Sequence, residues 1–76
     1  MTIKIKGISK EKLEKNGWEM LGDYDYNWYH KEINNLHVEI EKITDSMYYC
    51  EIPDYQDVFT DDLIAIYQEL KKLEEN

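Results

Sequence analysis

The chain has 76 residues, and its 17 acidic side chains outnumber its 9 basic ones to give a formal charge of -8 at neutral pH. A chain of this length builds one modest core, so we expect residues 1–76 to form a single domain. The acidic balance argues against direct binding of DNA or RNA, because proteins that bind nucleic acid are normally basic along the contact face.

The sequence also predicts where the protein works. Its first stretch, "MTIKIKGISK", alternates apolar and charged residues and lacks the apolar centre of a signal peptide. No apolar run approaches the roughly 20 residues needed to cross a bilayer. The single cysteine, Cys50, excludes an internal disulfide framework. We therefore expect a soluble cytoplasmic protein that does not contact a membrane.

The first predicted elements are a strand and a short helix. Residues 2–6 alternate in polarity, which predicts a short strand or an ordered arm. Ser9 is placed as the N-cap of a helix over about 10–16. Gly17 follows that helix and can end it, because glycine tolerates a positive φ.

Residues 18–52 are typical of strands. The segments "YDYNWYHKEI", "LHVEIEKI" and "MYYCEI" are aromatic, β-branched or alternating in polarity. Asn34-Asn35 predicts a two-residue turn, since asparagine tolerates the left-handed region. Residues 44–46 form the next connection, and Pro53 ends the last strand.

A helix closes the chain. Thr60 is its predicted cap, and Asp61 and Asp62 lie at the positive end of its dipole. We predict an α+β fold: an antiparallel sheet of three or four strands with this helix packed on one face and a short N-terminal helix. The helix would contact the sheet through an apolar stripe made of Leu63, Ile66, Tyr67, Leu70 and Leu73.

The two predicted turns determine the register of the sheet. If Asn34-Asn35 is a hairpin turn, Ile33 pairs with Leu36, and if 44–46 is a three-residue loop, Ile43 pairs with Met47. Both registers place apolar side chains on the same face, which supports both turns. That face is the predicted core, made of Tyr29, Ile33, Leu36, Val38, Ile40, Tyr48, Cys50 and Ile52.

The opposite face combines acids, histidines and aromatic residues. The same registers place His30 opposite Glu39, and Glu39 opposite Glu51. The second pair carries like charges, which costs stability unless something offsets it. Two interpretations remain: either the N-terminal arm and helix cover Tyr26 and Trp28, or these aromatic residues belong to an exposed surface that binds a partner.

One stretch has the spacing of a calcium loop. Asp23, Asp25 and Asn27 match the first three ligand positions of an EF-hand. However, the sixth position should be glycine and is Trp28, and the twelfth should be glutamate and is Asn34. The stretch is therefore better explained as an acidic loop that leads into a strand.

A zinc site is the sharper metal hypothesis. His30, Glu32, His37 and Glu39 would occupy two adjacent rungs of one face, and two histidines with carboxylates can hold zinc. Cross-strand His–Glu pairs are also ordinary salt bridges, and neither histidine has an evident second partner to orient it. We expect no bound metal and no cofactor.

Catalysis has little support in the sequence. Cys50 is predicted to point into the core, where a thiol is inert. Ser9 and Ser46 are explained by a cap and a turn, and the three glycines form no phosphate-binding loop. We expect a protein that is not an enzyme.

The distribution of acids favours a basic protein partner. Between Lys42 and Lys71 there are seven acids and no basic residue. Glu39 and Glu41 lie two apart on one strand face, roughly 6.8 Å from each other, a spacing comparable to successive phosphates of a nucleic-acid strand. The chain is thus a candidate inhibitor that occupies a nucleic-acid-binding site on another protein. The candidate contact residues are Asp23, Asp25, Tyr26, Trp28, His30, Glu39, Glu41, Tyr49, Glu51, Asp54, Asp57, Asp61 and Asp62.

A resemblance points in the same direction. "LEKNGWEML", followed by aromatic strands and the closing "LIAIYQELKKLEE" helix, resembles small proteins from phages and prophages of Gram-positive bacteria. Acidic proteins of this size from that setting are similar to anti-CRISPR inhibitors, several of which mimic nucleic acid. The resemblance implies inhibition of a CRISPR effector and assigns no particular binding residue.

The alternative is an interaction module without mimicry. In it, the aromatic face around Trp28, Met47 and Tyr49 forms a homodimer or docks on another protein. Ionic strength distinguishes the two hypotheses, because mimicry predicts salt-sensitive binding whereas an apolar interface holds in high salt.

Overall fold

The computed structural model describes residues 2–6, 8–21, 28–44 and 46–74. Five antiparallel strands form one sheet in the order β1-β5-β4-β3-β2. The fold is therefore α+β, as predicted, with five strands where three or four were expected. The elements are β1 (Thr2–Lys6), α1 (Lys10–Lys15), β2 (Glu19–Met20), β3 (Trp28–Ile33), β4 (Leu36–Thr44), β5 (Met47–Glu51) and α2 (Thr60–Glu74).

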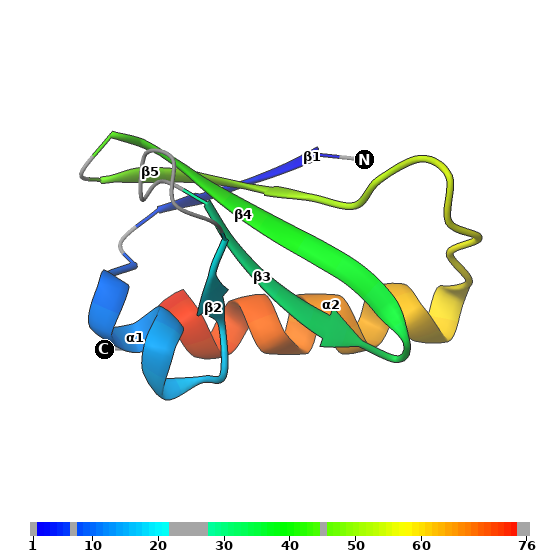
Figure 1. Cartoon of the computed structure of the whole chain (residues 1–76). Coiled ribbons are helices and arrows are strands. Elements are labelled where there is room, and N and C mark those ends of the chain that lie inside the picture. Colours follow the sequence, from blue (N-terminus) through cyan, green and yellow to red (C-terminus); the bar gives the residue numbers. More distant parts are fainter. Residues whose placement is uncertain (1, 7, 22–27, 45, 75–76) are drawn as a thin grey trace.

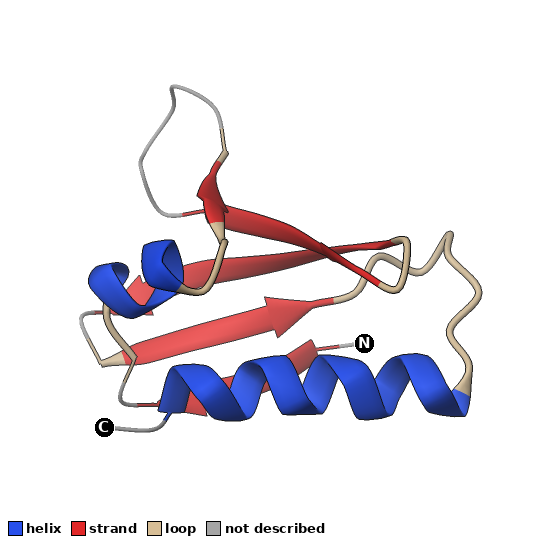
Figure 2. Ribbon diagram, turned by 90° about the horizontal axis from the view of Figure 1, so that it is seen from below, coloured by secondary structure: helices blue, strands red, loops and turns tan. Residues whose placement is uncertain are grey.

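The structure has two layers. Both helices lie on the same side of the sheet, with α2 running along it and α1 near the C-terminal end of α2 (Figures 1 and 2). The N-terminal segment does not cover the opposite side, because β1 instead extends the sheet beyond β5. Within the described ranges, no helix is long and apolar enough to cross a membrane.

The β3–β4 hairpin has the predicted register. Ile33 pairs with Leu36, and the pairing continues to Trp28 opposite Glu41. Asn34 and Asn35 have φ angles of 52° and 67°, the left-handed values that a two-residue type I′ turn requires at both central positions. This turn determines which side chains of β3 and β4 face the helices.

The β4–β5 pairing follows the predicted register over most of its length and then departs from it. Glu39 pairs with Glu51, but near the connection Met47 pairs with Thr44, because a bulge shifts the ladder between Lys42 and Thr44. The predicted pair of Ile43 and Met47 is therefore wrong. An extra residue in one strand of a pair leaves that residue unpaired, and Ile43 occupies this position with 44% of its surface exposed.

The core lies between the sheet and the helices. All eight residues of the predicted core face are buried, with exposed fractions between 0% and 8%. Ile5 joins them from β1, and Trp18 is buried after α1. The α2 stripe is confirmed except for Tyr67, which lies at its edge with 51% exposed. The helix side of the core is completed by Ile8, Leu13, Ile66, Leu70 and Leu73.

The short helix α1 begins and ends as the sequence predicts. The Ser9 side chain accepts a hydrogen bond from the Lys12 backbone N–H at 3.2 Å. Gly17, with φ of 86°, adopts a conformation that a side chain would strain. Six residues are too few for a stable isolated helix, so its support comes from buried Leu13.

The start of α2 differs from the prediction. Thr60 is the first helical residue, not the cap, and the Phe59 carbonyl accepts the first helical hydrogen bond from Leu63. Asp62 accepts a hydrogen bond from the Phe59 N–H at 3.0 Å and a second one from Asn34 Nδ2 at 3.2 Å. Asp62 therefore joins the start of α2 to the β3–β4 turn.

Candidate partner-binding face

The side of the sheet that faces away from both helices is called here the outer face. Among the described residues, its acidic side chains come from four adjacent strands, and its basic lysines come from β1 alone. The acids are Glu19, Glu32, Glu39, Glu41 and Glu51. The other side chains of this face are Thr2, Lys4, Lys6, Trp28, His30, His37, Thr44, Met47 and Tyr49.

One row of paired residues crosses the outer face. Glu51 pairs with Glu39, Glu39 with His30, and His30 with Glu19. His30 Nε2 lies 3.7 Å from Glu19 Oε2, and Glu39 Oε2 is contacted at 2.9 Å by His37 Nε2. His30 therefore lies between Glu19 and Glu39. Its pairing with Glu39 was predicted, whereas Glu19 is a neighbour that the sequence did not reveal.

The second row holds the aromatic residues. Trp28 pairs with Glu41, Glu41 with Tyr49, and Tyr49 with Lys4. Both rings are partly buried, so they lie along the sheet with part of their surface accessible. Glu41 therefore lies between two aromatic side chains, in an arrangement that presents charge and ring surface together.

Three of the outer-face glutamates form no ion pair within the part of the chain that the structure describes. Among the described residues, no lysine or histidine forms an ion pair with Glu32, Glu41 or Glu51. Glu51 also pairs directly with Glu39, and like charges at that spacing repel. The protein thus keeps an unfavourable concentration of negative charge on β3, β4 and β5.

The acidic area ends at β5. Lys4 and Lys6 of β1 are exposed on the same face, opposite Tyr49 and Met47. The alternating "TIKIK" pattern could have indicated that these lysines share a face. Their position next to β5 could not be predicted, because residues 2–6 and 47–51 are joined through the rest of the sheet and not by a turn.

The two histidines are near each other, but His30, Glu32, His37 and Glu39 do not assemble the zinc cluster considered from the sequence. The ring centroids of His30 and His37 lie 5.4 Å apart. Glu32 is exposed and pairs with His37 across the hairpin. In the part of the chain that the structure describes, no three His, Cys, Asp or Glu side chains are grouped so that they could hold a metal ion.

The second acidic surface is the connection from β5 to α2, residues 53–59. The β4–β5 register would place Pro53 opposite His37, but proline has no N–H to donate. The Gln56 side chain takes this place: its Oε1 accepts from the His37 N–H at 2.7 Å, and its Nε2 donates to the His37 carbonyl at 2.9 Å. Gln56 therefore fixes the loop to β4, a role that sequence reasoning missed.

The predicted acids of this region have different environments. Asp54, Asp57 and Asp61 are exposed, beside two aromatic side chains that are also exposed, Tyr55 at 79% and Phe59 at 69%. Asp62 differs because both of its oxygens accept hydrogen bonds within the fold. Asp57 and Asp61 can therefore meet a partner without breaking the hydrogen bonds that Asp62 accepts at the helix start.

Cys50 has no role on either surface. Its side chain is fully buried. Burial, with a smaller contribution in the same direction from the nearby Glu51 charge, raises the pKa of this thiol to about 12. The thiol is therefore protonated and inaccessible at neutral pH.

Three predicted contact residues, Asp23, Asp25 and Tyr26, lie outside the described residues, as does Asn27 of the calcium-like pattern. No protein-family model, curated protein or solved structure matches this chain.

Proposed function

We propose that this protein is a non-enzymatic inhibitor that binds a basic surface of another protein through its outer face and thereby blocks a nucleic-acid-binding site. The strongest support is the set of glutamates on adjacent strands, three of which have no ion-pair partner within the described chain. Uncompensated like charges reduce stability, and a basic partner removes that cost. Anti-CRISPR activity is the concrete form of this proposal.

The spacing of the acids supports mimicry of a nucleic-acid backbone. Strand geometry places the Cα atoms of Glu39 and Glu41 roughly 6.8 Å apart along β4. The Cα atom of Glu51 lies about 5.5 Å from that of Glu39 across the ladder. Trp28 and Tyr49 flank Glu41 and offer ring surfaces beside the charges, as bases do beside phosphates. A groove that binds nucleic acid through phosphate charges and stacked bases would meet both features on this face.

The test uses charge reversal and competition. Tagged protein is incubated with lysate of a Gram-positive host that expresses CRISPR effectors, and the beads are washed in steps of rising salt. The expected result is capture of a nuclease or guide complex, release by salt or excess nucleic acid, and inhibition of DNA cleavage by that nuclease. The double variant Glu41→Lys with Glu51→Lys should lose both capture and inhibition.

The matched control carries the same charge change elsewhere. Glu11 and Glu14 are exposed on α1, on the helix side of the molecule, and their reversal to lysine should leave capture intact. Equal loss in both double variants would indicate a nonspecific charge effect and contradict the proposed face. Loss only on reversal of Asp57 and Asp61 would move the contact to the 53–59 loop and the start of α2.

A second candidate function is self-association through the same face. The observation in its favour is Ile43, which the bulge leaves 44% exposed at the end of β4 where Met47 begins β5. A symmetric dimer would bring the Glu39 and Glu51 charges of two copies together, so it should form only when salt screens them. Sedimentation at 0.05 M and 1 M salt tests this candidate, because the dimer should appear only at the higher salt concentration. Binding to a basic partner should instead weaken as salt is added.

A further inference from the structure

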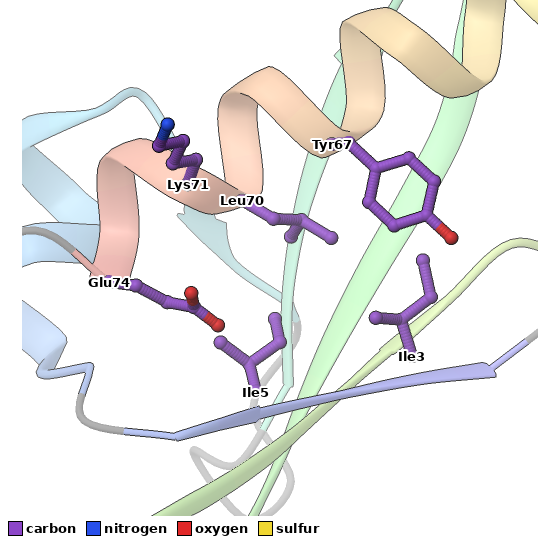
Figure 3. Close-up of a pocket in the computed structure, with 6 residues that line it drawn as sticks. All are labelled: Ile3, Ile5, Tyr67, Leu70, Lys71 and Glu74. Carbon is purple, nitrogen blue, oxygen red and sulfur yellow. The ribbon is translucent and has the colours of Figure 1, made fainter.

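The outer edge of β1 is open and borders an apolar groove. β1 ends the sheet on one side, so nothing within the described chain continues the ladder beyond it. Between β1 and α2 lies a groove of about 390 Å³ (Figure 3). It is lined by Ile3, Ile5, Tyr67, Leu70, Lys71 and Glu74.

The ladder identifies which backbone groups are available at this edge. The Gln56 bonds show that the His37 backbone faces β5, and by alternation so do those of Glu39 and Glu41. Along β5, the backbone groups of Tyr49 and Glu51 therefore face β4, and those of Tyr48 and Cys50 face β1. Their partners in β1 are Ile5 and Ile3, whose hydrogen-bonding groups face β5. The N–H and C=O groups of Thr2, Lys4 and Lys6 consequently point away from the sheet.

The two faces of this edge have different chemistry. On the outer face, Lys4 and Lys6 are exposed beside the available backbone groups. On the helix side, the groove is bounded by Ile3 and by the ring of Tyr67, which stands across from it in Figure 3. Figure 3 shows the Glu74 carboxylate near Ile5, whereas the Lys71 ammonium points away from Ile3 and Ile5.

The same flank of α2 carries apolar surface that the core does not use. Tyr67 is 51% exposed and lines the groove, and Ile64, one helical turn before it, is also 51% exposed. Large exposed apolar side chains next to an open strand edge are a site for pairing with another chain. Tyr67, wrong as a core prediction, therefore presents its ring at the groove.

We infer that the β1 edge binds an extended peptide segment of a partner protein, in which acidic and apolar residues alternate. The segment adds a sixth strand next to β1 and hydrogen-bonds the backbone of Thr2, Lys4 and Lys6. Its acidic side chains lie on the outer face against Lys4 and Lys6, and its apolar side chains enter the groove between Ile3 and Tyr67. This site is separate from the glutamates proposed to bind a basic surface.

Charge argues for such a segment over a second copy of this chain. Antiparallel pairing of two β1 edges about their centres would place Lys4 directly opposite Lys4 of the other copy. Lysines on an edge strand oppose this kind of pairing. An acidic segment converts the same lysines into cross-strand partners of opposite charge.

The test uses a synthetic peptide and the whole protein labelled with ¹⁵N. The peptide has seven residues, alternates glutamate and valine, and is acetylated and amidated. Titration should produce saturable shifts of the Thr2, Lys4 and Lys6 amides, together with amides around Tyr67. A peptide with lysine in place of glutamate should bind more weakly, and one with N-methylated backbone on the pairing side should not bind.

Two substitutions locate the site. Lys4→Glu should weaken binding of the glutamate peptide about fivefold or more, whereas Lys15→Glu, an equal change of charge at an exposed position of α1, should not. Tyr67→Ser removes one wall of the groove without disturbing buried residues and should also weaken binding.

Three results would overturn the inference. They are no saturable shift at millimolar peptide, equal affinity for the lysine peptide, and a dimer of the free protein in which the amides of Lys4 and Lys6 are protected from hydrogen exchange. The last result would assign the edge to a second copy of the chain.

Discussion

Lys31 on β3 and Glu69 on α2 form an ion pair with 2.8 Å between Lys31 Nζ and Glu69 Oε2. The same ammonium donates to the Asn16 carbonyl at 2.7 Å, which is the end of α1. One side chain of the sheet thereby connects both helices. Lys31 lies on the helix side of β3, whose core positions are Tyr29 and Ile33.

This arrangement predicts acid sensitivity. Burial alone would raise the pKa of Glu69, but the hydrogen bonds from Lys31 and Lys72 outweigh it and hold the pKa below the ordinary value of 4.5. A carboxylate with a lowered pKa stabilises the fold fully above its unfolded-state value, and this contribution is lost as pH falls through the folded-state value. Glu69→Gln should lower the free energy of unfolding by about 1–3 kcal/mol at pH 7.

The difference between the parent and Glu69→Gln should shrink as the pH falls below 4.5, because the protonated carboxyl then resembles the amide. Urea unfolding at several pH values measures it. Glu11→Gln, at an exposed position of α1, is the control and should show little change. A difference that stays constant from pH 7 to pH 3 would show that the pair contributes nothing through its charge.

Gln56→Ala should destabilise the protein by about 1–3 kcal/mol, because the His37 N–H and carbonyl lose two hydrogen bonds and proline cannot replace them. Hydrogen exchange of the His37 amide is the specific measurement, and it should accelerate. Gln68→Ala, at an exposed position of α2, should leave both stability and exchange unchanged. Unchanged protection of His37 in the Gln56 variant would mean that the loop is held by other contacts.

Asn35→Gly should stabilise the hairpin by a few tenths to about 1 kcal/mol, because glycine adopts φ near 67° without a steric penalty. Asn35→Ala should instead cost about 1 kcal/mol. Thermal unfolding of the two variants and the parent shows whether each substitution raises or lowers the stability. Position 35 is preferred to Asn34, whose side chain also bonds Asp62. An alanine variant as stable as the parent would contradict a type I′ turn.

Glu51→Gln should raise stability by about 0.2–1 kcal/mol, because it removes the repulsion between Glu51 and Glu39. If the outer face binds a basic partner, the same variant should bind more weakly. Unfolding in low salt and capture of the partner are measured on one preparation. A variant that gains stability and retains full binding would exclude Glu51 from the contact.

Cys50 should resist thiol reagents in the folded protein at pH 8, because burial raises the pKa of the thiol to about 12 and closes access to it. Ellman's reagent should react within minutes in 8 M urea and far more slowly without it. Rapid reaction under native conditions would show that β5 opens locally at low free-energy cost.

Much of the fold follows from local rules. The Asn34-Asn35 turn determined the β3–β4 register, and polarity alternation then assigned Ile33, Val38 and Ile40 to the core, since a slip of one residue would expose them. The helix-ending Gly17 was also evident, because its conformational freedom is a property of the residue itself. The Ile43 bulge was not, because only Thr44 follows it in β4, too short a stretch to show the reversed alternation that an extra residue causes.

The tertiary structure alone decided which distant segments meet. β1 pairs with β5 although residues 7–46 separate them, and this places Lys4 beside Tyr49 and leaves an open edge next to Tyr67. Glu19 reaches His30, and Gln56 replaces the hydrogen bonds that Pro53 cannot make. The sequence by itself determined most of the elements, the apolar face of β3, β4 and β5 and the acidic character, because periodicity and turn geometry act over a few residues. The position of the lysine edge and the groove depends on contacts between residues far apart in the chain, which no local pattern encodes.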